Sequence, residues 1–424
     1  MMSSAPILTP FLDDADVILY AGDCMEVMAR MPEASVDAIV TDPPYGLEFM
    51  GKDWDGFGTP LGFQTWTEAW AREAFRVLKP GGHLLAFAGT RTYHRMASGV
   101  EDAGFEIRDC IAWMYGSGFP KSLDVSKAID KAAGAEREVV GTVKKTPSAG
   151  GENTNTGWTR PWAEGKSTMD ITAPATPEAA KWNGWGTALK PAYEPIVVAR
   201  KPLTGTVAQN VLEHGTGALN IDSCRIPSPD GVPMFSQKGN ASANGIYSDG
   251  LNGSKSLGQR DYESGRWPAN IALDATAAKM LDEQSGHLVS TIAGGDRGKR
   301  PSGFADVGAD KGDPRPAGPT YADNGGASRF FYTAKASRQD RNAGGADNTH
   351  PTVKPTELMR WLIRLVTPPG GIILDPFGGS GSTGLAARAE NTRCILIERE
   401  PEYLNIIRQR LSQLSLLSEL LDTE

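Results

Sequence analysis

The sequence predicts an α/β protein whose mostly parallel sheet has helices on both faces and is interrupted by a long irregular insert. Three observations predict this class. Short apolar runs alternate with amphipathic helical segments over 17–115, and the same alternation returns over 355–412. Between them, 120–330 is rich in Gly, Ser, Asn, Pro and Thr. Because buried strands separated by helices belong to parallel sheets, the two ordered stretches are expected to form such a sheet.

The first ordered stretch contains four apolar runs that predict buried strands: VILY (17–20), VDAIVT (36–41), HLLAFAG (83–89) and CIAWMY (110–115). Helical spacing predicts the connecting helices over 24–31, over 65–78 and up to about Ala103. The helix over 65–78 is followed by Lys79-Pro80-Gly81-Gly82, which ends it because proline and glycine disfavour a continuing helix.

The irregular segment offers only scattered strand candidates, EPIVVAR (194–200) and PANIALD (268–274). The second ordered stretch begins with a helix from 355 that carries Leu358, Leu362 and Leu365 on one face. It continues with a strand, a helix, a strand and a final helix: 371–375, 382–390, 394–398 and from about Pro401.

Composition excludes several classes of protein. With 40% apolar residues in 424, the chain can bury a sizeable core and is not wholly disordered. It has no run of 18 apolar residues, so we expect no membrane span, and its N-terminus lacks the basic and apolar regions of a secretory signal. Four cysteines without a CxxC pair argue against a disulfide framework or zinc cluster. A cytoplasmic protein without a bound metal is therefore expected.

The net charge of −8 is unevenly distributed. Residues 121–350 hold 27 Lys and Arg against 25 Asp and Glu, so the excess acid lies in the flanking stretches. A near-neutral middle can carry a local basic face, which permits nucleic-acid binding without arguing for it.

A glycine-rich turn lies between the strand at 371–375 and the helix at 382–390. Gly379, Gly381 and Gly384 match the pattern G-x-G-x-x-G, which lets the backbone approach a ligand while helix amides face it. Glu398 ends the next strand, where an acidic side chain can bind ribose hydroxyls. No lysine follows the glycines, so a phosphate-cradling P-loop is excluded. The pattern predicts a site for an adenosine-bearing cofactor.

A second motif, Thr41-Asp42-Pro43-Pro44-Tyr45, follows the strand at 36–41. Ligands bind beyond the carboxyl ends of strands in such sheets. The two prolines restrict the backbone, and the Asp42 carboxylate and Pro43 carbonyl can accept two hydrogen bonds from one amino group. The ring of Tyr45 can stack on a planar ligand. This combination predicts a receptor for an amino-bearing base.

Together the two motifs resemble those of the amino-methyltransferases, which methylate exocyclic amines of DNA bases with S-adenosylmethionine. HPTVKP (350–355) is similar to a segment that precedes the glycine loop in that family, and Gly22-Asp23 is similar to its GD element. The motif order, with DPPY first and the glycine loop last, resembles the circularly permuted β group of DNA methyltransferases. The resemblance implies the Rossmann-like methyltransferase fold, an S-adenosylmethionine cofactor and a double-stranded DNA substrate.

The resemblance also implies a division of the chain and a set of site residues. A catalytic half over 15–119 and a cofactor half over 331–413 would flank a target-recognition insert over 120–330, with a C-terminal tail over 414–424. The catalytic residues would be Asp42, Pro43, Pro44 and Tyr45. The residues implied for the cofactor are Asp23 at its adenine, Glu398 at its ribose, and Thr352, Lys354, Asp375, Phe377, Gly378, Gly379, Gly381 and Thr383 around its methionine end.

Within the insert, the stretch 158–185 contains four tryptophans with basic residues nearby: Trp158, Trp162, Trp182 and Trp185. Such aromatics can stack on bases, but a small loop-rich region also needs large side chains for its own core, and both interpretations remain open. The resemblance admits a homodimer and a cognate restriction enzyme as further partners.

Four alternatives compete with adenine-N6 methylation of DNA. Cytosine-N4 methylation uses the same fold, although that group more often has Ser in place of Asp42. Guanine-amino rRNA methyltransferases can carry DPPY but usually have the glycine loop first. A nicotinamide dehydrogenase would leave TDPPY and HPTVKP unexplained. A catalytically inactive DNA-binding protein is the alternative outside enzymes, and the intact Asp42, Tyr45 and glycine loop argue against it.

Overall fold

The computed structural model describes residues 8–14, 16–47, 55–116, 118, 122–144, 168–227, 265–289, 324–334, 348, 350 and 353–421, without the side chains of 144, 288, 289, 324 and 413–421. In these ranges the chain forms one ten-stranded sheet and two small two-stranded sheets. The large sheet has the order β1-β2-β14-β13-β3-β4-β8-β5-β9-β12. Its strands are β1 (Leu12–Asp13), β2 (Val17–Ala21), β3 (Val36–Thr41), β4 (Leu78–Phe87), β5 (Glu106–Met114), β8 (Tyr193–Arg200), β9 (Ile271–Asp274), β12 (Tyr332–Ala334), β13 (Ile372–Asp375) and β14 (Arg393–Glu398).

The large sheet is mostly parallel. From β2 through β14, β13 and β3 to β4 every pairing is parallel, as are the pairings of β5 with β9 and of β9 with β12. β8 runs antiparallel to both of its neighbours, β4 and β5, and β1 runs antiparallel to β2 at the edge. The predicted α/β class with a mostly parallel sheet is confirmed.

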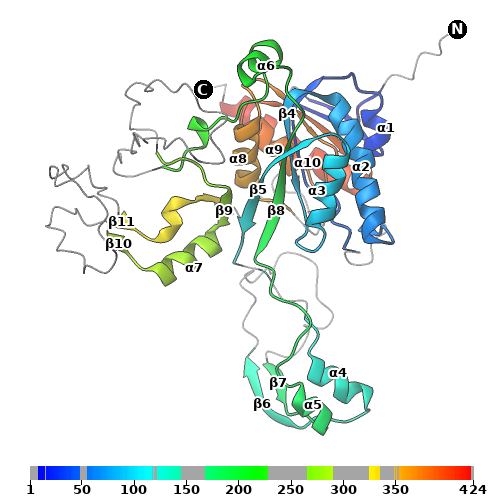
Figure 1. Cartoon of the computed structure of the whole chain (residues 1–424), viewed down its shortest axis with the longest axis vertical. Coiled ribbons are helices and arrows are strands. Elements are labelled where there is room, and N and C mark those ends of the chain that lie inside the picture. The colour runs from blue at the N-terminus through cyan, green and yellow to red at the C-terminus, as the bar shows by residue number, and fades with distance from the viewer. Residues whose placement is uncertain are drawn as a thin grey trace, which may run out of the picture.

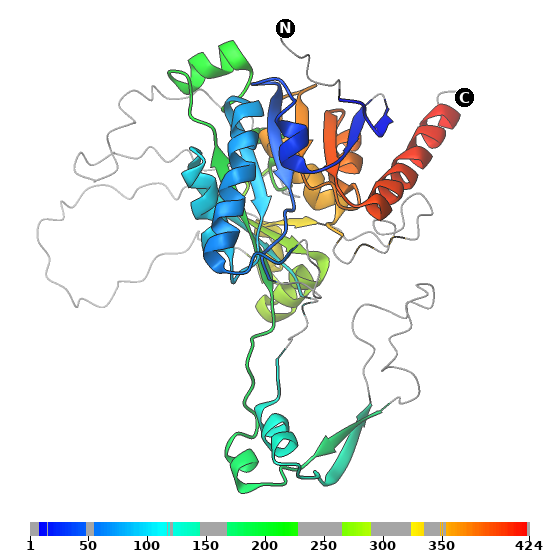
Figure 2. The same cartoon turned by 90° about the vertical axis from the view of Figure 1, so that its right-hand side faces the viewer.

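Helices cover both faces of this sheet, as Figures 1 and 2 show. One face packs against the early helices α1 (Cys24–Met28), α2 (Pro60–Val77) and α3 (Tyr93–Asp102). The other packs against the late helices α8 (Thr356–Val366), α9 (Ser382–Ala389) and α10 (Pro401–Leu421). Along β4, Leu84 and Ala86 belong to the first core while Leu85 and Phe87 belong to the second, as expected for a strand buried on both faces.

The two halves of the chain complete one sheet. β13 and β14 come from the end of the sequence, yet they lie between β2 and β3 from its beginning. The register pairs Leu374 of β13 with Ile39 of β3. The loops that follow β3 and β13 therefore leave the same edge of the sheet side by side, although more than 300 residues separate them in sequence.

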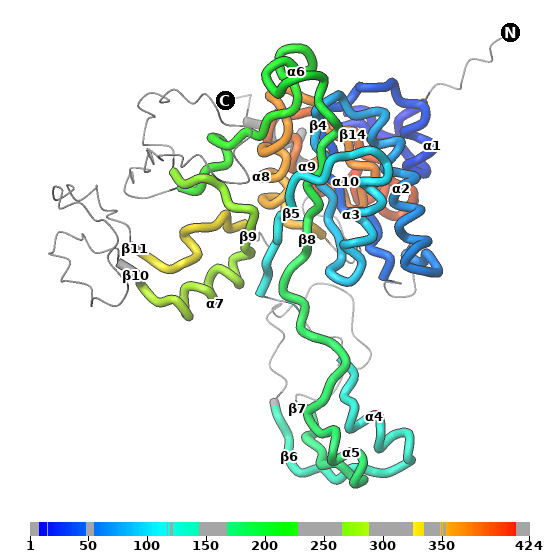
Figure 3. The backbone as a smooth tube through the Cα atoms, viewed as in Figure 1, coloured from blue at the N-terminus to red at the C-terminus, as the bar shows by residue number. Residues whose placement is uncertain are grey.

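The remaining elements lie outside this central layer. α4 (Val125–Ala132), β6 (Val139–Lys144), β7 (Thr168–Thr172) and α5 (Pro177–Lys181) form a small lobe that projects from the body, and β8 runs from the lobe into the sheet (Figure 3). The described residues also include α6 (Val207–His214), η3 (Asp222–Cys224), α7 (Ala275–Ser285), β10 (Leu288–Val289), β11 (Asn324–Gly325) and η5 (Ala327–Phe330).

The lobe is held together mainly by polar contacts. The buried carboxylate of Asp130 accepts hydrogen bonds from the backbone amides of Ala175 and Thr176, both at 3.0 Å, and pairs with Arg137 at 2.5 Å. Two of the four tryptophans considered for base stacking, Trp182 and Trp185, pack edge to face with ring centroids 5.0 Å apart, and both are exposed. Trp158 and Trp162 lie outside the described residues.

Most predicted elements occur within a few residues of their expected bounds, and VDAIVT (36–41) coincides with β3. One difference concerns the predicted insert, 120–330, because Tyr193–Arg200 within it forms β8 in the middle of the sheet. Its five consecutive buried residues, Pro195 to Ala199, pair on both sides, and this burial places the strand in the core. The helix predicted over 65–78 ends at Val77, as expected before Lys79-Pro80-Gly81-Gly82, and these four residues already belong to β4.

In the part of the chain that the structure describes, no helix combines the length and the apolar character needed to span a membrane.

Candidate active site

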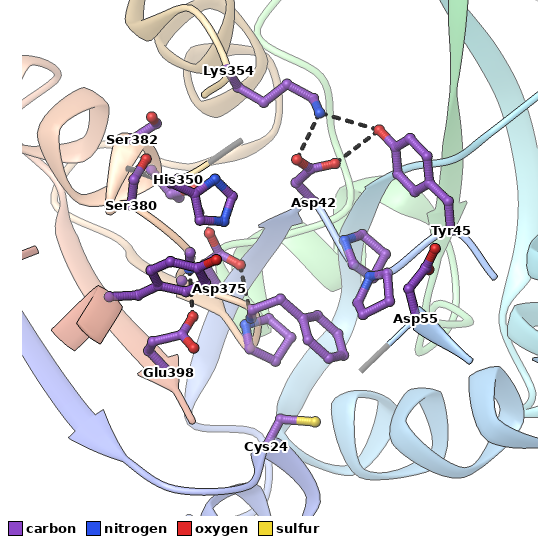
Figure 4. A pocket seen from close by; sticks show the side chains of 18 of the residues that line it. Cys24, Asp42, Tyr45, Asp55, His350, Lys354, Asp375, Ser380, Ser382 and Glu398 are labelled. Atoms are coloured by element: carbon purple, nitrogen blue, oxygen red, sulfur yellow. Dashed lines mark hydrogen bonds and ion pairs between the residues drawn. The ribbon is translucent and has the colours of Figure 1, made fainter. Parts of the chain in front are cut away.

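The predicted base receptor and the predicted cofactor loop share one pocket. The loop after β3 and the loop after β13 both line a cavity of about 510 Å³, a size in the range of small-molecule sites. Figure 4 shows Asp42, Tyr45 and Lys354 toward one end of the pocket, with Asp375 and Glu398 away from them. The sheet order produces this arrangement, because β13 and β3 are neighbours.

Four polar side chains make contact at the first end. Lys354 Nζ lies 2.6 Å from Asp42 Oδ2, 3.1 Å from the Tyr45 hydroxyl and 3.3 Å from Glu194 Oε2. The Tyr45 hydroxyl in turn lies 2.9 Å from Asp42 Oδ1 and 3.0 Å from Glu194 Oε2. We call this group the Asp42 cluster. Glu194 reaches it from β8, and Lys354 reaches it from the residues just before α8.

Electrostatics fix the protonation of the two central donors in the Asp42 cluster. Burial by itself would lower the pKa of Lys354, but Asp42 and Glu194 outweigh burial and raise that pKa above its ordinary value. Burial, helped by the same two carboxylates, raises the pKa of Tyr45 well above 10. Lys354 is therefore an ammonium and Tyr45 a neutral phenol over the whole physiological pH range.

The backbone that carries Tyr45 is anchored from two directions. The buried carboxylate of Asp55 accepts hydrogen bonds from the amides of Gly46 and Leu47 at 2.6 and 3.0 Å. The Thr92 hydroxyl donates to the Tyr45 carbonyl at 2.6 Å. These contacts hold the loop after the two prolines in one conformation, so Tyr45 is presented rigidly to the pocket.

The glycine loop follows β13. Gly379 and Gly381 have φ angles of +53° and +81°, which side-chain-bearing residues rarely adopt. A Cβ at Gly381 would also lie 3.1 Å from the Ile407 side chain, whereas Gly378 and Gly379 line the pocket directly. Behind the loop, the fully buried Arg410 of α10 donates to the Ser380 carbonyl and lies 3.0 Å from the Ser380 hydroxyl.

Asp375 joins the two loops at the end of β13. Its buried carboxylate accepts hydrogen bonds from the Thr41 hydroxyl at 2.6 Å, from the Phe377 amide at 3.0 Å and from the Thr383 hydroxyl. Burial outweighs these three donors and raises the pKa of Asp375 to about 7, and nearby Asp42 adds to the rise. The same carboxylate therefore connects the strand that carries Asp42 to the glycine loop.

The other predicted cofactor residues lie beyond Asp375. Glu398 accepts from the Gly379 amide at 2.7 Å with one oxygen and from the Glu400 amide at 2.8 Å with the other, and burial raises its pKa. A carboxylate has about four acceptor sites, so Glu398 keeps acceptor capacity for a ligand hydroxyl. Asp23 caps α1 by accepting from the Met25 amide at 2.9 Å and also lines the pocket. Phe377 packs edge to face on Trp70 at the pocket wall.

The structure thus brings nearly all the predicted site residues together. Every one of them lines the pocket except Gly381, which shapes the loop from behind, and Thr352, which lies outside the described residues. Lys354 is expected at the methionine end of the cofactor, but its contacts are with Asp42, Tyr45 and Glu194. Whether it also binds the cofactor stays a prediction.

Three contributors to the site were missed from the sequence: Glu194, Asp55 and Arg410. Glu194 is the first residue of the strand candidate EPIVVAR, and a charged residue at the end of an apolar strand is a signal that could have identified it. No sequence signal marks Asp55, because the amides of Gly46 and Leu47 face it only in the folded loop. None marks Arg410 either, because its partner is the backbone carbonyl of Ser380, 30 residues earlier in the chain. Among the described residues, no three His, Cys, Asp or Glu side chains are placed to hold a metal ion.

The fold and the pocket define a Rossmann-like protein with a glycine-loop site for an adenosine-bearing cofactor. The family profile N6_N4_Mtase, described as DNA methylase, matches residues 36–409, and the chain belongs to this family. It is a DNA methyltransferase of the N6/N4 family, and the cofactor of this family is S-adenosylmethionine.

Individual proteins show the same similarity. The chain is 24% identical to the type II methyltransferase M.HindIII of Haemophilus influenzae over 93% of its own length and 94% of that protein. It is 35% identical to the type II methyltransferase M.XycI of Xanthomonas campestris pv. cyanopsidis over 20% of its own length and 33% of that protein. Among solved structures, the cytosine-N4-specific PvuII DNA methyltransferase aligns with 14% identity and a TM-score of 0.43, covering 95% of this chain and 88% of that one.

The pocket suits S-adenosylmethionine on structural grounds. The positive φ angles of Gly379 and Gly381 bring the loop backbone close to the cavity, and Gly378 and Gly379 present no side chain there. Glu398 has carboxylate lone pairs left for ribose hydroxyls at the carboxyl end of β14. These features fit an adenosyl group, which needs close backbone approach and an acidic partner for its ribose.

Proposed function

We propose that the protein is a site-specific DNA methyltransferase of the circularly permuted β group that methylates adenine at N6. One observation carries the proposal: Asp42 and Pro43, which follow β3, line the same pocket as the glycine loop and Glu398. An amino group bound at Asp42 would therefore share a single cavity with the cofactor. The order of the strands, with β13 and β14 between β2 and β3, supports the permuted assignment.

The target adenine must leave the double helix before its amine can reach the pocket, because N6 lies inside the duplex. Asp42 and the Pro43 carbonyl would accept the two amine hydrogens, and the Tyr45 ring would stack on the base. Both Asp42 oxygens already accept one hydrogen bond, from Tyr45 and from Lys354, and each has a second lone pair for the amine. Holding both hydrogens directs the nitrogen lone pair toward the cofactor side of the pocket.

S-adenosylmethionine supplies an electrophilic methyl group on a sulfonium. The protein's own contribution is mainly to position the amine, and Asp42 accepts the proton that the methylated nitrogen loses. Asp42 can pass this proton to water, because about a fifth of its side chain remains exposed.

The cofactor residues are assigned by the same proposal. Glu398 would bind the ribose and Asp23 the adenine amino group, while Asp375, Phe377, Thr383 and the loop glycines would shape the methionine pocket. Asp23 can do this because capping α1 uses only one of its oxygens. Thr352 belongs to the proposal on its sequence motif alone.

Double-stranded DNA is the proposed partner, and the segment 120–330, apart from strands in the sheet, would recognise its sequence. The projecting lobe joins the sheet through the start of β8 (Figure 3), where Tyr193 and Glu194 line the pocket, and from this place it would reach DNA around the flipped base. A homodimer and a cognate restriction enzyme belong to the same proposal, and so does a cytoplasmic location.

Cytosine-N4 methylation is the second candidate, because cytosine offers the same amino group to Asp42 and Pro43. The first position of the DPPY motif favours adenine, since the cytosine-N4 group more often carries serine there. The experiment is single-molecule sequencing of DNA from cells that express the protein or its Asp42→Ala variant. We expect N6-methyladenine in one short sequence with the first protein and none with the second.

Two results would contradict the proposal. N4-methylcytosine would overturn the adenine assignment while leaving the pocket chemistry intact. Undiminished methylation by Asp42→Ala would overturn the role of the carboxylate. S-adenosylmethionine binding by the purified variant, measured by calorimetry, is the control for correct folding.

A further inference from the structure

The Asp42 cluster contains a hydrogen-bond donor directly beside the proposed amine acceptor. Lys354 Nζ lies 2.6 Å from Asp42 Oδ2, and the lysine is 6% exposed. Both groups line the pocket, so a ligand bound at Asp42 meets a buried ammonium next to the carboxylate. The amine-binding role of Asp42 explains the carboxylate but gives no reason for the cation.

The pair is complementary to a particular edge of a base. In adenine the N6 amino donor sits beside the N1 acceptor, on the same carbon, and in cytosine the N4 amino donor sits beside the N3 acceptor in the same way. Guanine and thymine present the reverse order, a carbonyl beside a ring N–H. Enzymes that flip bases read this Watson–Crick edge by hydrogen bonds. An acceptor and a donor side by side therefore match adenine and cytosine and reject the other two bases.

We propose that Lys354 donates a hydrogen bond to the ring nitrogen adjacent to the target amine, and that Glu194 holds Lys354 in place for this contact. The inference rests on the proposed function, because it takes Asp42 as the amine receptor. It makes Lys354 a residue that contacts the substrate and Glu194 a positioning residue.

Glu194 is needed because the ammonium changes partners. An ammonium has three protons, and in the structure they face Asp42, Tyr45 and Glu194. When the base binds, the proton that faces Asp42 can turn to the ring nitrogen while Glu194 and Tyr45 keep the other two. Without Glu194, a buried ammonium would have only the carboxylate that the base is about to occupy.

The surroundings of Lys354 favour a contact with the base and not with the methionine end of the cofactor. Its Nζ also lies 5.4 Å from the Tyr45 ring centroid and 4.8 Å from that of Phe87, so aromatic faces hold the cation beside the proposed stacking residue. In Figure 4, Lys354 points to Asp42 and Tyr45, with Glu398 on the far side of the pocket.

The experiment uses duplexes with the recognition sequence in which the target adenine is replaced by 1-deazaadenine, whose C–H stands where N1 accepts. For the unaltered protein we expect kcat/KM to fall roughly ten- to hundredfold on the substituted duplex, as for a lost hydrogen bond to a charged group. A duplex with 7-deazaadenine, which changes the opposite edge, is the matched substrate control and should react at nearly the normal rate.

The variants test whether the loss belongs to Lys354. Lys354→Met should react slowly on adenine and on 1-deazaadenine alike, so that the ratio of the two rates approaches one. Glu194→Gln should reduce the ratio in part and should lose activity as pH rises toward the alkaline range, because Lys354 keeps its proton less firmly. Glu106→Gln removes another β-strand glutamate, which pairs with Arg200 at 2.6 Å at the far end of β8, and should leave ratio and pH profile unchanged.

Three results would overturn the inference. The first is equal methylation of the adenine and 1-deazaadenine duplexes by the unaltered protein, a result that counts against the inference without any variant. Lys354→Met could keep the full discrimination. Its loss of activity could also match a loss of S-adenosylmethionine affinity with discrimination intact, which would place the lysine at the cofactor. If sequencing identifies cytosine as the target, the same comparison with 3-deazacytosine separates an error in the adenine assignment from an error in this inference.

Discussion

The buried carboxyl of Asp375 makes the stability of the protein depend on pH in a defined direction. Burial raises its pKa from 3.8 to about 7 in the folded state. A raised pKa means that the folded protein binds this proton more tightly than the unfolded chain does. Asp375 therefore costs no stability below pH 3.8, and the penalty grows as pH rises and is complete above about 7. A rise of roughly three pH units corresponds to ~4 kcal/mol.

The perturbation is Asp375→Asn, which removes the titration and keeps the shape of the side chain. The amide keeps one acceptor oxygen and places an NH2 group where the other oxygen accepts, so part of the hydrogen bonding to Thr41, Phe377 and Thr383 is lost. This loss lowers the stability of the variant by an amount that does not vary with pH. The difference in unfolding free energy between the two proteins should therefore shrink by about 4 kcal/mol from pH 4 to pH 8.

Urea unfolding followed by tryptophan fluorescence, at half-unit steps of pH, measures this difference. Glu106→Gln, in an ion pair with Arg200 at the far end of β8, serves as the control and should give a nearly constant difference. Parallel stability curves for Asp375→Asn and the unaltered protein would show that the carboxyl titrates normally in the folded state, and would refute the reasoning.

Two further predictions concern the loops. Gly381→Ala forces a residue with a Cβ into φ +81° and against Ile407, so the affinity for S-adenosylmethionine, measured by calorimetry, should fall and the free energy of unfolding should drop by about 1–3 kcal/mol. The control variant Gly370→Ala, at φ +69° in open space, should lose stability but keep the affinity. Equal losses of affinity in both variants would contradict the steric argument. Asp55→Ala removes two hydrogen bonds that hold the loop after Tyr45. In a methyl-transfer assay kcat should therefore fall tenfold or more, while the affinity for the cofactor stays the same. An unchanged kcat would show that Asp55 does not position Tyr45.

The sequence predicted much of the fold because the relevant signals are local. A mostly apolar run such as VDAIVT (36–41) favours burial on both faces, and it forms β3 in the middle of the sheet. The glycines at 379 and 381 and the prolines at 43 and 44 restrict their own backbone, so the two loops could be recognised from a few neighbouring letters. The strand EPIVVAR (194–200) was found, but its place in the sheet was not.

By itself, the sequence determined the α/β class, and it predicted the glycine loop with Glu398 and the proposed amine receptor at Asp42, since each depends on residues adjacent in the chain or one strand away. Only the tertiary structure decided what surrounds Asp42. Strand pairing places β13 beside β3 and β8 beside β4. These pairings bring Lys354, 312 residues away in sequence, and Glu194, 152 residues away, to the cluster around the Asp42 carboxylate. The reason is physical: a long-range strand pairing is selected by the burial of the whole sheet, and no short stretch of sequence records which polar side chains will meet at its edge.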